Sequence, residues 1–275
     1  MSSPRVHRVG YTPSSRRQTS VRDDHSYPPS TQDSPRPADS GFPTPSEVEQ
    51  HIDAYFTYVQ PYNTNALFHR STLLADLAAN RLNPVLILAL CTITERYFHL
   101  DSPYPQGSPR AEVWLQQAMS ALIISTEKCL DNVLIALLLA RHCIHSGIHG
   151  STWNLVALAN RQATGIGLHR EDAPGSSRSG DRDSETRRRA WWACYALDRM
   201  MATGLPEFTL CPPHRIRVGL PCRDEIWAND SASKGKVVVP KIQEVELDAT
   251  AEDFVDVGLM GHSVRLVGIR YAIIR

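Results

Sequence analysis

Helical periodicity runs through most of this 275-residue chain after its first 45 residues, and it restricts the fold more than any other feature. Apolar side chains recur every three to four positions, whereas the alternating pattern of a strand is almost absent, Val237–Val239 being a short exception. Ser46 with Glu49 matches a capping box. Asn83-Pro84 and Ser108-Pro109 each place a capping side chain before a proline in the first turn. We expect seven helices, beginning at or near Ser46, Asn83, Ser108, Asp131, Ser151, residue 185 and Thr250.

Seven helices joined by polar loops predict an all-α fold, a multi-helix, bundle-like domain with long irregular loops. Residues 1–45 are rich in Ser, Pro and Arg, and we expect them to form a disordered tail. The helical domain is expected at 46–275, with flexible loops at 172–184 and 223–248. The chain stops inside an apolar helical pattern, so we expect a domain truncated at its C-terminus. An apolar face left uncovered there would favour self-association, and its expected members are Phe254, Val257, Val264 and Ile269.

The charge balance and the cysteines weigh against DNA reading by this chain alone. It carries 29 basic and 29 acidic residues, whereas a chain that grips DNA unaided usually has a basic excess. Its six cysteines are spread from Cys91 to Cys222 without a C-x-x-C pair, which does not suit a zinc cluster. No apolar stretch has the length of a membrane span, so we expect no membrane contact.

One group of side chains leaves open a metal-dependent function. His142, His145 and His149 follow one another at intervals of three and four, a spacing that can gather imidazoles around zinc on one helix face. Gly147 interrupts that helix, and the competing interpretation is a polar helix end. The chain has no G-x-S-x-G, P-loop or G-x-G-x-x-G motif, and we expect no enzyme activity.

The helix expected at 185–203 carries the most informative pattern. Glu185 can pair with Arg188 and Arg189, three and four positions later. The run of arginines that begins at Arg187 allows a DNA or nuclear-import patch, but a solvated first turn is the favoured interpretation. An aspartate, Asp198, shares the face of the aromatic residues and needs a partner if it is buried. Arg199 points about 100° away, so we expect that partner elsewhere in the fold.

These residues resemble a known family. Arg187-Arg188-Arg189-x-Trp-Trp-x-x-Tyr-x-Leu-Asp-Arg199 resembles the signature helix of the fungal-specific transcription factor domain, the middle homology region of fungal binuclear zinc-cluster transcription factors. Gly204-Leu205-Pro206 and Ile216-x-Val218-x-Leu-Pro221 resemble the elements that follow it, with Leu205 where arginine is common. Gly-Leu-His-Arg at 167–170 resembles the end of an upstream block, and residues 55–73, from Tyr55-Phe56 through Phe68-His69-Arg70 to Leu73, resemble the entry segment. The resemblance covers about 46–275.

The resemblance implies a nuclear regulatory domain that modulates transcription by RNA polymerase II. Zinc and DNA contact are expected only in a separate N-terminal cluster, absent from this chain. The implied partners are the transcription machinery or other transcription factors, a second copy in a homodimer, and a small-molecule inducer. A helical interaction scaffold, or a truncated co-regulator that does not bind DNA, stays as the alternative. The family-motif residues are Arg188, Trp191, Trp192, Tyr195, Asp198, Arg199, Gly204, Pro206, Val218 and Pro221.

Overall fold

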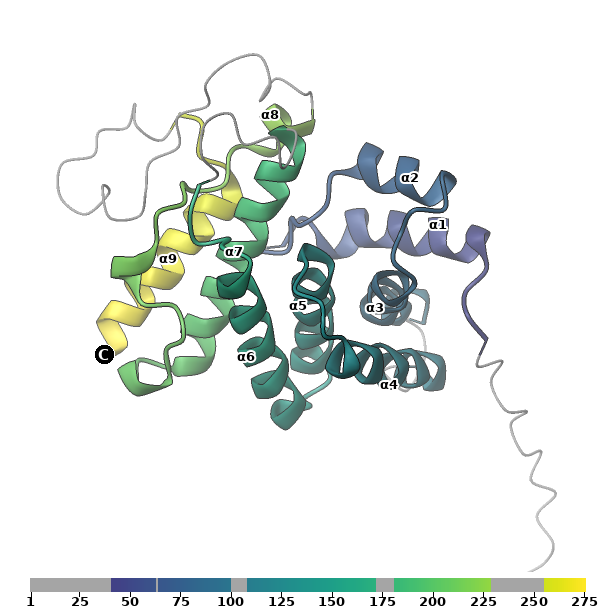
Figure 1. Ribbon diagram of the computed structural model, residues 1–275, viewed down its shortest axis with the longest axis horizontal. Coiled ribbons are helices and arrows are strands. Elements are labelled where there is room, and N and C mark those ends of the chain that lie inside the picture. The colour runs from purple at the N-terminus through teal and green to yellow at the C-terminus, as the bar shows by residue number, and fades with distance from the viewer. Residues whose placement is uncertain (1–40, 63, 100–107, 172–180, 229–254) are drawn as a thin grey trace, which may run out of the picture. The chain divides into compact units, whose positions relative to one another are not determined.

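The computed structural model describes residues 41–62, 64–99, 108–171, 181–228 and 255–275, and for 181–183 the backbone alone (Figure 1). These residues form an all-α structure, as the sequence predicts, and contain two isolated β-bridges but no strand. Shorter turns are the π-helical Tyr55–Val59 and 3₁₀ turns at Glu95–Phe98, Pro206–Phe208 and Pro213–Arg215. The α-helices are α1 (Pro45–Ala54), α2 (Arg70–Ala78), α3 (Pro84–Thr94), α4 (Pro109–Ile124), α5 (Leu130–His145), α6 (His149–Gly165), α7 (Asp181–Ala202), α8 (Asp224–Ala228) and α9 (Leu259–Ile274).

Two of the three predicted caps are confirmed. Asn83 accepts from the amide of Val85 at 2.9 Å, and Ser108 accepts from the amide of Ala111 at 3.3 Å. The predicted Ser46–Glu49 capping box is wrong. Thr44 caps α1 instead, because Pro45 already occupies the first helical turn and the Glu47 carboxylate accepts from the Thr44 amide at 2.7 Å.

The structure also adds one helix and changes three predicted boundaries. Helix α2 was not expected. Helix α7 begins at Asp181, so 181–184 is helical backbone and only 172–180 of the predicted loop lies outside the described residues. Within the predicted loop 223–248, residues 224–228 form α8 and bury Trp227, so that part is helical. The last helix begins at Leu259 and not near Thr250. Of the predicted disordered tail 1–45, residues 1–40 lie outside the described residues, 41–44 have no regular secondary structure and Pro45 begins α1. Val237–Val239 and Phe254 also lie outside the described residues.

Helices α5 and α7 are the two central helices, around which the other helices pack. The run Val133–Ala140 of α5 is buried on every side, and α5 packs against α3 and α6. Helix α7 packs against α6 and, as Figure 1 shows, lies alongside α9. An all-round apolar sequence such as that of α5 can only be accommodated inside a core, which is why α5 lies between neighbouring helices.

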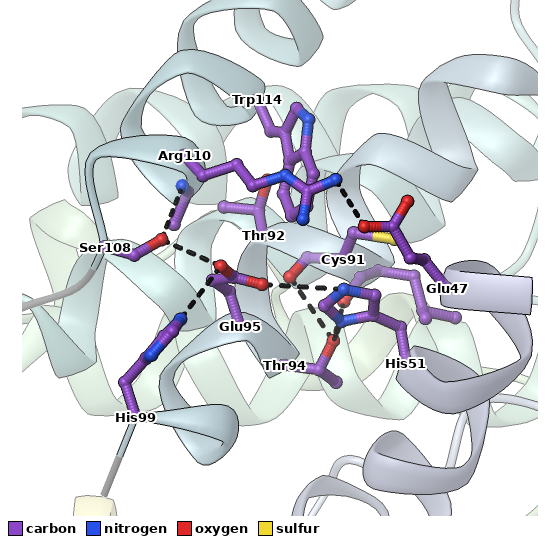
Figure 2. A network of polar contacts seen from close by, with 12 residues as sticks. Glu47, His51, Cys91, Thr92, Thr94, Glu95, His99, Ser108, Arg110 and Trp114 are labelled. Atoms are coloured by element: carbon purple, nitrogen blue, oxygen red, sulfur yellow. Dashed lines mark hydrogen bonds and ion pairs between the residues drawn. The ribbon is translucent and has the colours of Figure 1, made fainter. Parts of the chain in front are cut away.

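A buried polar network joins α1 to α3 and α4 (Figure 2). His51 contacts Thr94 Oγ1 through Nδ1 at 2.8 Å and faces the Glu95 carboxylate through Nε2 at 3.5 Å. Glu95 also accepts from Ser108 Oγ at 2.9 Å. His51 is 4% exposed, and its burial lowers its pKa to about 4 although Glu95 acts in the opposite direction. The imidazole is therefore neutral in the folded protein near pH 7.

We expect His51 to make the fold sensitive to acid. The unfolded chain binds a proton on this side chain near pH 6.5, and the folded chain only near pH 4. The free energy of unfolding is therefore unaffected by His51 above pH 6.5 and decreases as the pH falls from 6.5 to 4. The loss attributable to His51 should approach about 3 kcal/mol at pH 4. Urea unfolding of the native chain and of His51→Gln between pH 7 and pH 4 measures the difference in slope.

Exposed His149 provides the matched control, since His149→Gln should leave the slope of the native chain unchanged. Parallel curves for the native chain and His51→Gln would show that His51 does not carry the dependence.

Candidate functional site

Helix α7 buries nearly every side chain of its second half, including the predicted aromatic residues. Trp192 is fully buried and its Nε1 donates to the Gly219 carbonyl at 2.6 Å. Tyr195 packs edge-on against Trp192, with ring centroids 5.3 Å apart. Trp191 is 3% exposed. The aromatic residues of the motif therefore hold the segment around Gly219 against α7. Their role is structural.

Arg189 is the centre of a buried network at the start of α7. It is 0% exposed, which corrects the expectation that the arginine run is a solvated first turn. Its guanidinium donates to Glu185 at 2.8 Å, to Asp224 at 2.6 Å and to the Cys222 carbonyl at 2.7 Å. The guanidinium also lies 4.0 Å from the ring centroid of Trp227. A cation with this many fixed acceptors can be buried, because its charge is paired and its donors are used.

The Arg189 network joins blocks that are far apart in the sequence. Arg189 also donates to the carbonyl of Ala66, 123 residues earlier, at 3.3 Å. Glu185 accepts from the Cys222 amide at 3.0 Å. The predicted pairing of Glu185 with Arg188 and Arg189 is confirmed. The entry segment, the signature helix and the segment after Pro221 therefore meet at one buried ion cluster.

Arg188 extends the same cluster toward α6. It pairs with Glu185 and, at 3.2 Å, with Glu171. Glu171 in turn accepts from the amide of Gly219 at 2.9 Å. Arg187 donates to the Ile166 carbonyl at 3.4 Å. All three arginines of the run, which suggests a DNA patch in the sequence, therefore form hydrogen bonds or ion pairs within the chain.

Asp198 and Arg199 form a second buried ion pair, at the other end of α7. Asp198 accepts from the amides of Leu210 at 2.9 Å and Cys211 at 3.1 Å. These two amides confirm the expected partners elsewhere in the fold. Asp198 also accepts from Arg199 at 2.8 Å, so the expectation that its sequence neighbour is not a partner is wrong. Arg199 can reach it because its long side chain bends back between the rings of Tyr195 and Tyr271, each 4.7 Å away. Burial raises the pKa of Asp198, and the two amides and Arg199 oppose that effect.

The remaining motif residues shape the loop after α7. Gly204 has a φ of +90°, and a Cβ there would lie 2.7 Å from the carbonyl oxygen of Ile274 at the end of α9, which is why glycine is needed. Pro206 begins the exposed 3₁₀ turn. Val218 is buried, and the Pro221 carbonyl accepts from the amide of Gly258 at 3.1 Å. These residues hold the loop against α7 and α9.

A cavity of about 580 Å³, here called the basic pocket, opens between the end of α6, α7 and the loop at 210–217. The amide of Arg217 donates to the carbonyl of His169 at 2.7 Å and so joins two of its walls. The indole Nε1 of Trp191 and the Nδ1 of His169 are buried in its inner wall without a hydrogen-bond partner among the described residues. The lining residues are Thr164, His169, Arg170, Trp191, Leu210, Pro212, His214, Arg215 and Arg217.

The predicted metal alternative is not supported. His142 and His145 end α5, whereas His149 begins α6, and the turn at Gly147, with a φ of +72°, separates them. Among the residues that the structure describes, no three His, Cys, Asp or Glu side chains are grouped as a metal site requires. The cysteines are free, and five of the six are buried. Burial raises the pKa of Cys222 to about 12 and that of Cys143 to about 11, which disfavours the thiolate that binds zinc.

Sequence reasoning missed three kinds of residue here. It included Arg188 but not the more deeply buried Arg189 among the motif residues, although the spacing from Glu185 marks both. It missed Asp224 and did not connect His169 with Trp191, because nothing local indicates that these segments meet. Sequence reasoning also did not single out Arg215 and Arg217, the cationic residues of the loop. Their one signal is a concentration of basic residues next to a motif block.

The sequence profile described as the fungal specific transcription factor domain matches residues 52–241, and the chain belongs to this family. This is a family of transcription factors and not a class of enzymes. The match includes α7 and both buried ion clusters.

The chain is similar to several fungal regulators. Zn(2)-C6 fungal-type transcription factor FTF1c of Fusarium oxysporum f. sp. lycopersici is 27% identical over 196 residues, which cover 66% of this chain and 20% of that protein. FTF2 of the same fungus is 28% identical over 190 residues, covering 64% and 17%. An uncharacterized transcriptional regulatory protein of Schizosaccharomyces pombe is 29% identical over 160 residues, covering 54% and 18%. The aligned part therefore spans about a fifth of these relatives. No solved structure matches.

Proposed function

We propose that this chain is the regulatory domain of a fungal transcription factor and modulates RNA polymerase II transcription in the nucleus. The observation that carries the proposal is the family match over 52–241, within which separate motif blocks meet at Arg189. The domain acts through contacts with the transcription machinery or other transcription factors. In the described residues, no helix is both long and apolar enough to cross a membrane.

DNA contact belongs, in this proposal, to a zinc cluster of the kind named in the relatives and not to the helical domain. Two observations support that division of labour. The net charge of the chain is zero, and the arginine run of α7 is engaged in internal contacts. Phosphate binding needs cationic side chains that remain available to solvent.

A reporter assay tests the proposal. The chain is fused to a foreign DNA-binding module in a fungal host, and transcription from its cognate promoter is compared with that of the module alone across several carbon and nitrogen sources. We expect a change of several-fold in at least one condition. Arg189→Met, matched for protein level, should lose the effect because the motif blocks no longer meet. Equal transcription with and without the chain in every condition would contradict the proposal.

A second candidate, a self-associating scaffold, is favoured by the outer face of α9. Four apolar side chains follow one another there at spacings of seven, three and four residues, as in a coiled-coil seam. They are Leu259, Leu266, Ile269 and Ile273, exposed by 65%, 66%, 54% and 77%. Of the expected face, Ile269 is confirmed as exposed, whereas Val257 and Val264 are buried against the domain.

We expect the chain to dimerise through this face. Sedimentation velocity over a concentration series should show a dimer, because pairing two such helices removes the exposed apolar area from water. The double change Leu266→Glu/Ile273→Glu should yield a monomer, whereas changing the exposed Ile123 and Ile124 of α4 to Glu should not. A native chain that stays monomeric at high concentration would rule the seam out.

A further inference from the structure

We propose that the basic pocket binds a small organic dianion, such as a dicarboxylate or a phosphate monoester. The binding stands on the pocket alone, and it rests on the proposed function only for its consequence for transcription. Its walls come from the end of α6, the middle of α7 and the loop at 210–217, three blocks that the family motifs already mark.

The charge of the pocket has one sign. Arg170, Arg215 and Arg217 surround the opening, His214 lies beside them, and none of the described residues lining it is acidic. Cationic side chains that line one cavity attract an anion into it. The same field acts on His169, whose pKa is lowered first by burial and then by Arg170 and Arg215. The lining of the pocket is therefore suited to an anion.

The rings of Trp191 and His169 form the inner wall of the pocket. Trp191 is 3% exposed and His169 is 8% exposed, and their rings lie against each other with centroids 5.6 Å apart. Trp191 Nε1 and His169 Nδ1 have no partner among the described residues, although buried polar atoms are normally paired. An indole N–H can only donate, so its natural complement is an oxygen acceptor. Both atoms are buried beneath the surface of the pocket, so a ligand contacts the lining arginines and not these two atoms.

The size and the remaining lining define the ligand further. A volume of about 580 Å³ suits a small molecule and is too small for a folded partner. Leu210 and Pro212 supply apolar contact for a short carbon body, and the Thr164 hydroxyl adds a polar contact. The guanidinium groups of Arg170 and Arg215, from two segments, match a ligand with more than one negative group, because arginine binds carboxylate and phosphate in a two-pronged geometry.

The site is fixed in advance and connected to α7. The backbone bond from Arg217 to His169 holds two walls together, and Asp198 fixes the amide of Leu210 at 2.9 Å. A preformed site binds without first ordering its loop. A ligand here would tie the 210–217 loop to α6 and α7, where the motif blocks meet.

Titration calorimetry of the full chain tests the proposal with succinate and glycerol 3-phosphate, each against its neutral counterpart, succinamide and glycerol. We expect at least one dianion to bind and its neutral counterpart not to bind. Arg170→Gln and Arg215→Gln, both at exposed positions that leave the core intact, should each weaken binding at least tenfold. Arg270→Gln is the matched control, since Arg270 lines a different cavity, of about 520 Å³, between α7 and α9.

The indole N–H resonance of Trp191, assigned through Trp191→Phe, provides an independent readout and should move on binding. The proposal is overturned if neither dianion exceeds its neutral counterpart, or if Arg270→Gln weakens binding as much as Arg215→Gln. It is also overturned if duplex DNA binds in an Arg170- and Arg215-dependent way while neither dianion does. A failed reporter assay would leave this binding result unaffected, so the two proposals can fail separately.

Discussion

Replacing Arg189 by methionine should lower the free energy of unfolding by about 3–5 kcal/mol, the cost typical of breaking a buried ion pair on one side. Methionine fills much of the volume but removes every donor. Glu185, 2% exposed, loses a charge partner, and the carbonyls of Ala66 and Cys222 lose their bonds. The contact of the guanidinium with Trp227 is lost as well. Urea unfolding followed by circular dichroism measures the change.

A surface ion pair in the same chain supplies the control. Arg81 pairs with Asp76 at 2.6 Å, but their side chains are 62% and 32% exposed. Arg81→Met should cost less than about 1 kcal/mol, because water screens and replaces such a pair. If Arg189→Met cost no more than Arg81→Met, the buried cluster would not be what holds the motif blocks together. A double change, Glu185→Gln with Arg189→Met, should cost less than the sum of the single changes, since it leaves no unpaired buried charge.

Asp198→Asn should be the second large effect, lowering the free energy of unfolding by about 3 kcal/mol. The substitution keeps the shape but leaves Arg199, 1% exposed, without its anion. One side-chain oxygen also becomes an NH₂ group, so one of the two amide donors at Leu210 and Cys211 faces another donor. The loop should then separate from α7. Unfolding curves give the energy, and hydrogen exchange at the amides of 210 and 211 shows the local release.

The matched control is again on the surface, because Asp76→Asn makes the same chemical change in the exposed pair with Arg81. It should alter stability by less than about 1 kcal/mol and leave exchange at 210 and 211 unchanged. Unchanged exchange at those amides in Asp198→Asn would show that Asp198 does not hold the loop.

Local chemistry made much of the fold predictable. The caps at Asn83 and Ser108 depend on neighbouring residues alone, and the apolar run of α5 admits only a buried helix. The cap of α1 was misplaced by two residues, because two competing Ser/Thr-x-x-Glu patterns overlap there and Pro45 favours the earlier one. The order of the motif blocks was also in the sequence, and it was enough to place the chain in its family.

What the sequence alone determined is therefore the helical class, most helix starts and the family. The tertiary structure decided which charges are buried. Glu185 and Arg189 can form an ion pair in any helix, because they are four residues apart. The pair is buried only because Ala66, Cys222 and Trp227 pack around it. The basic pocket likewise exists only where α6, α7 and the 210–217 loop converge. The physical reason is that capping and periodicity act over a few residues, whereas burial and electrostatic fields depend on segments that folding brings together.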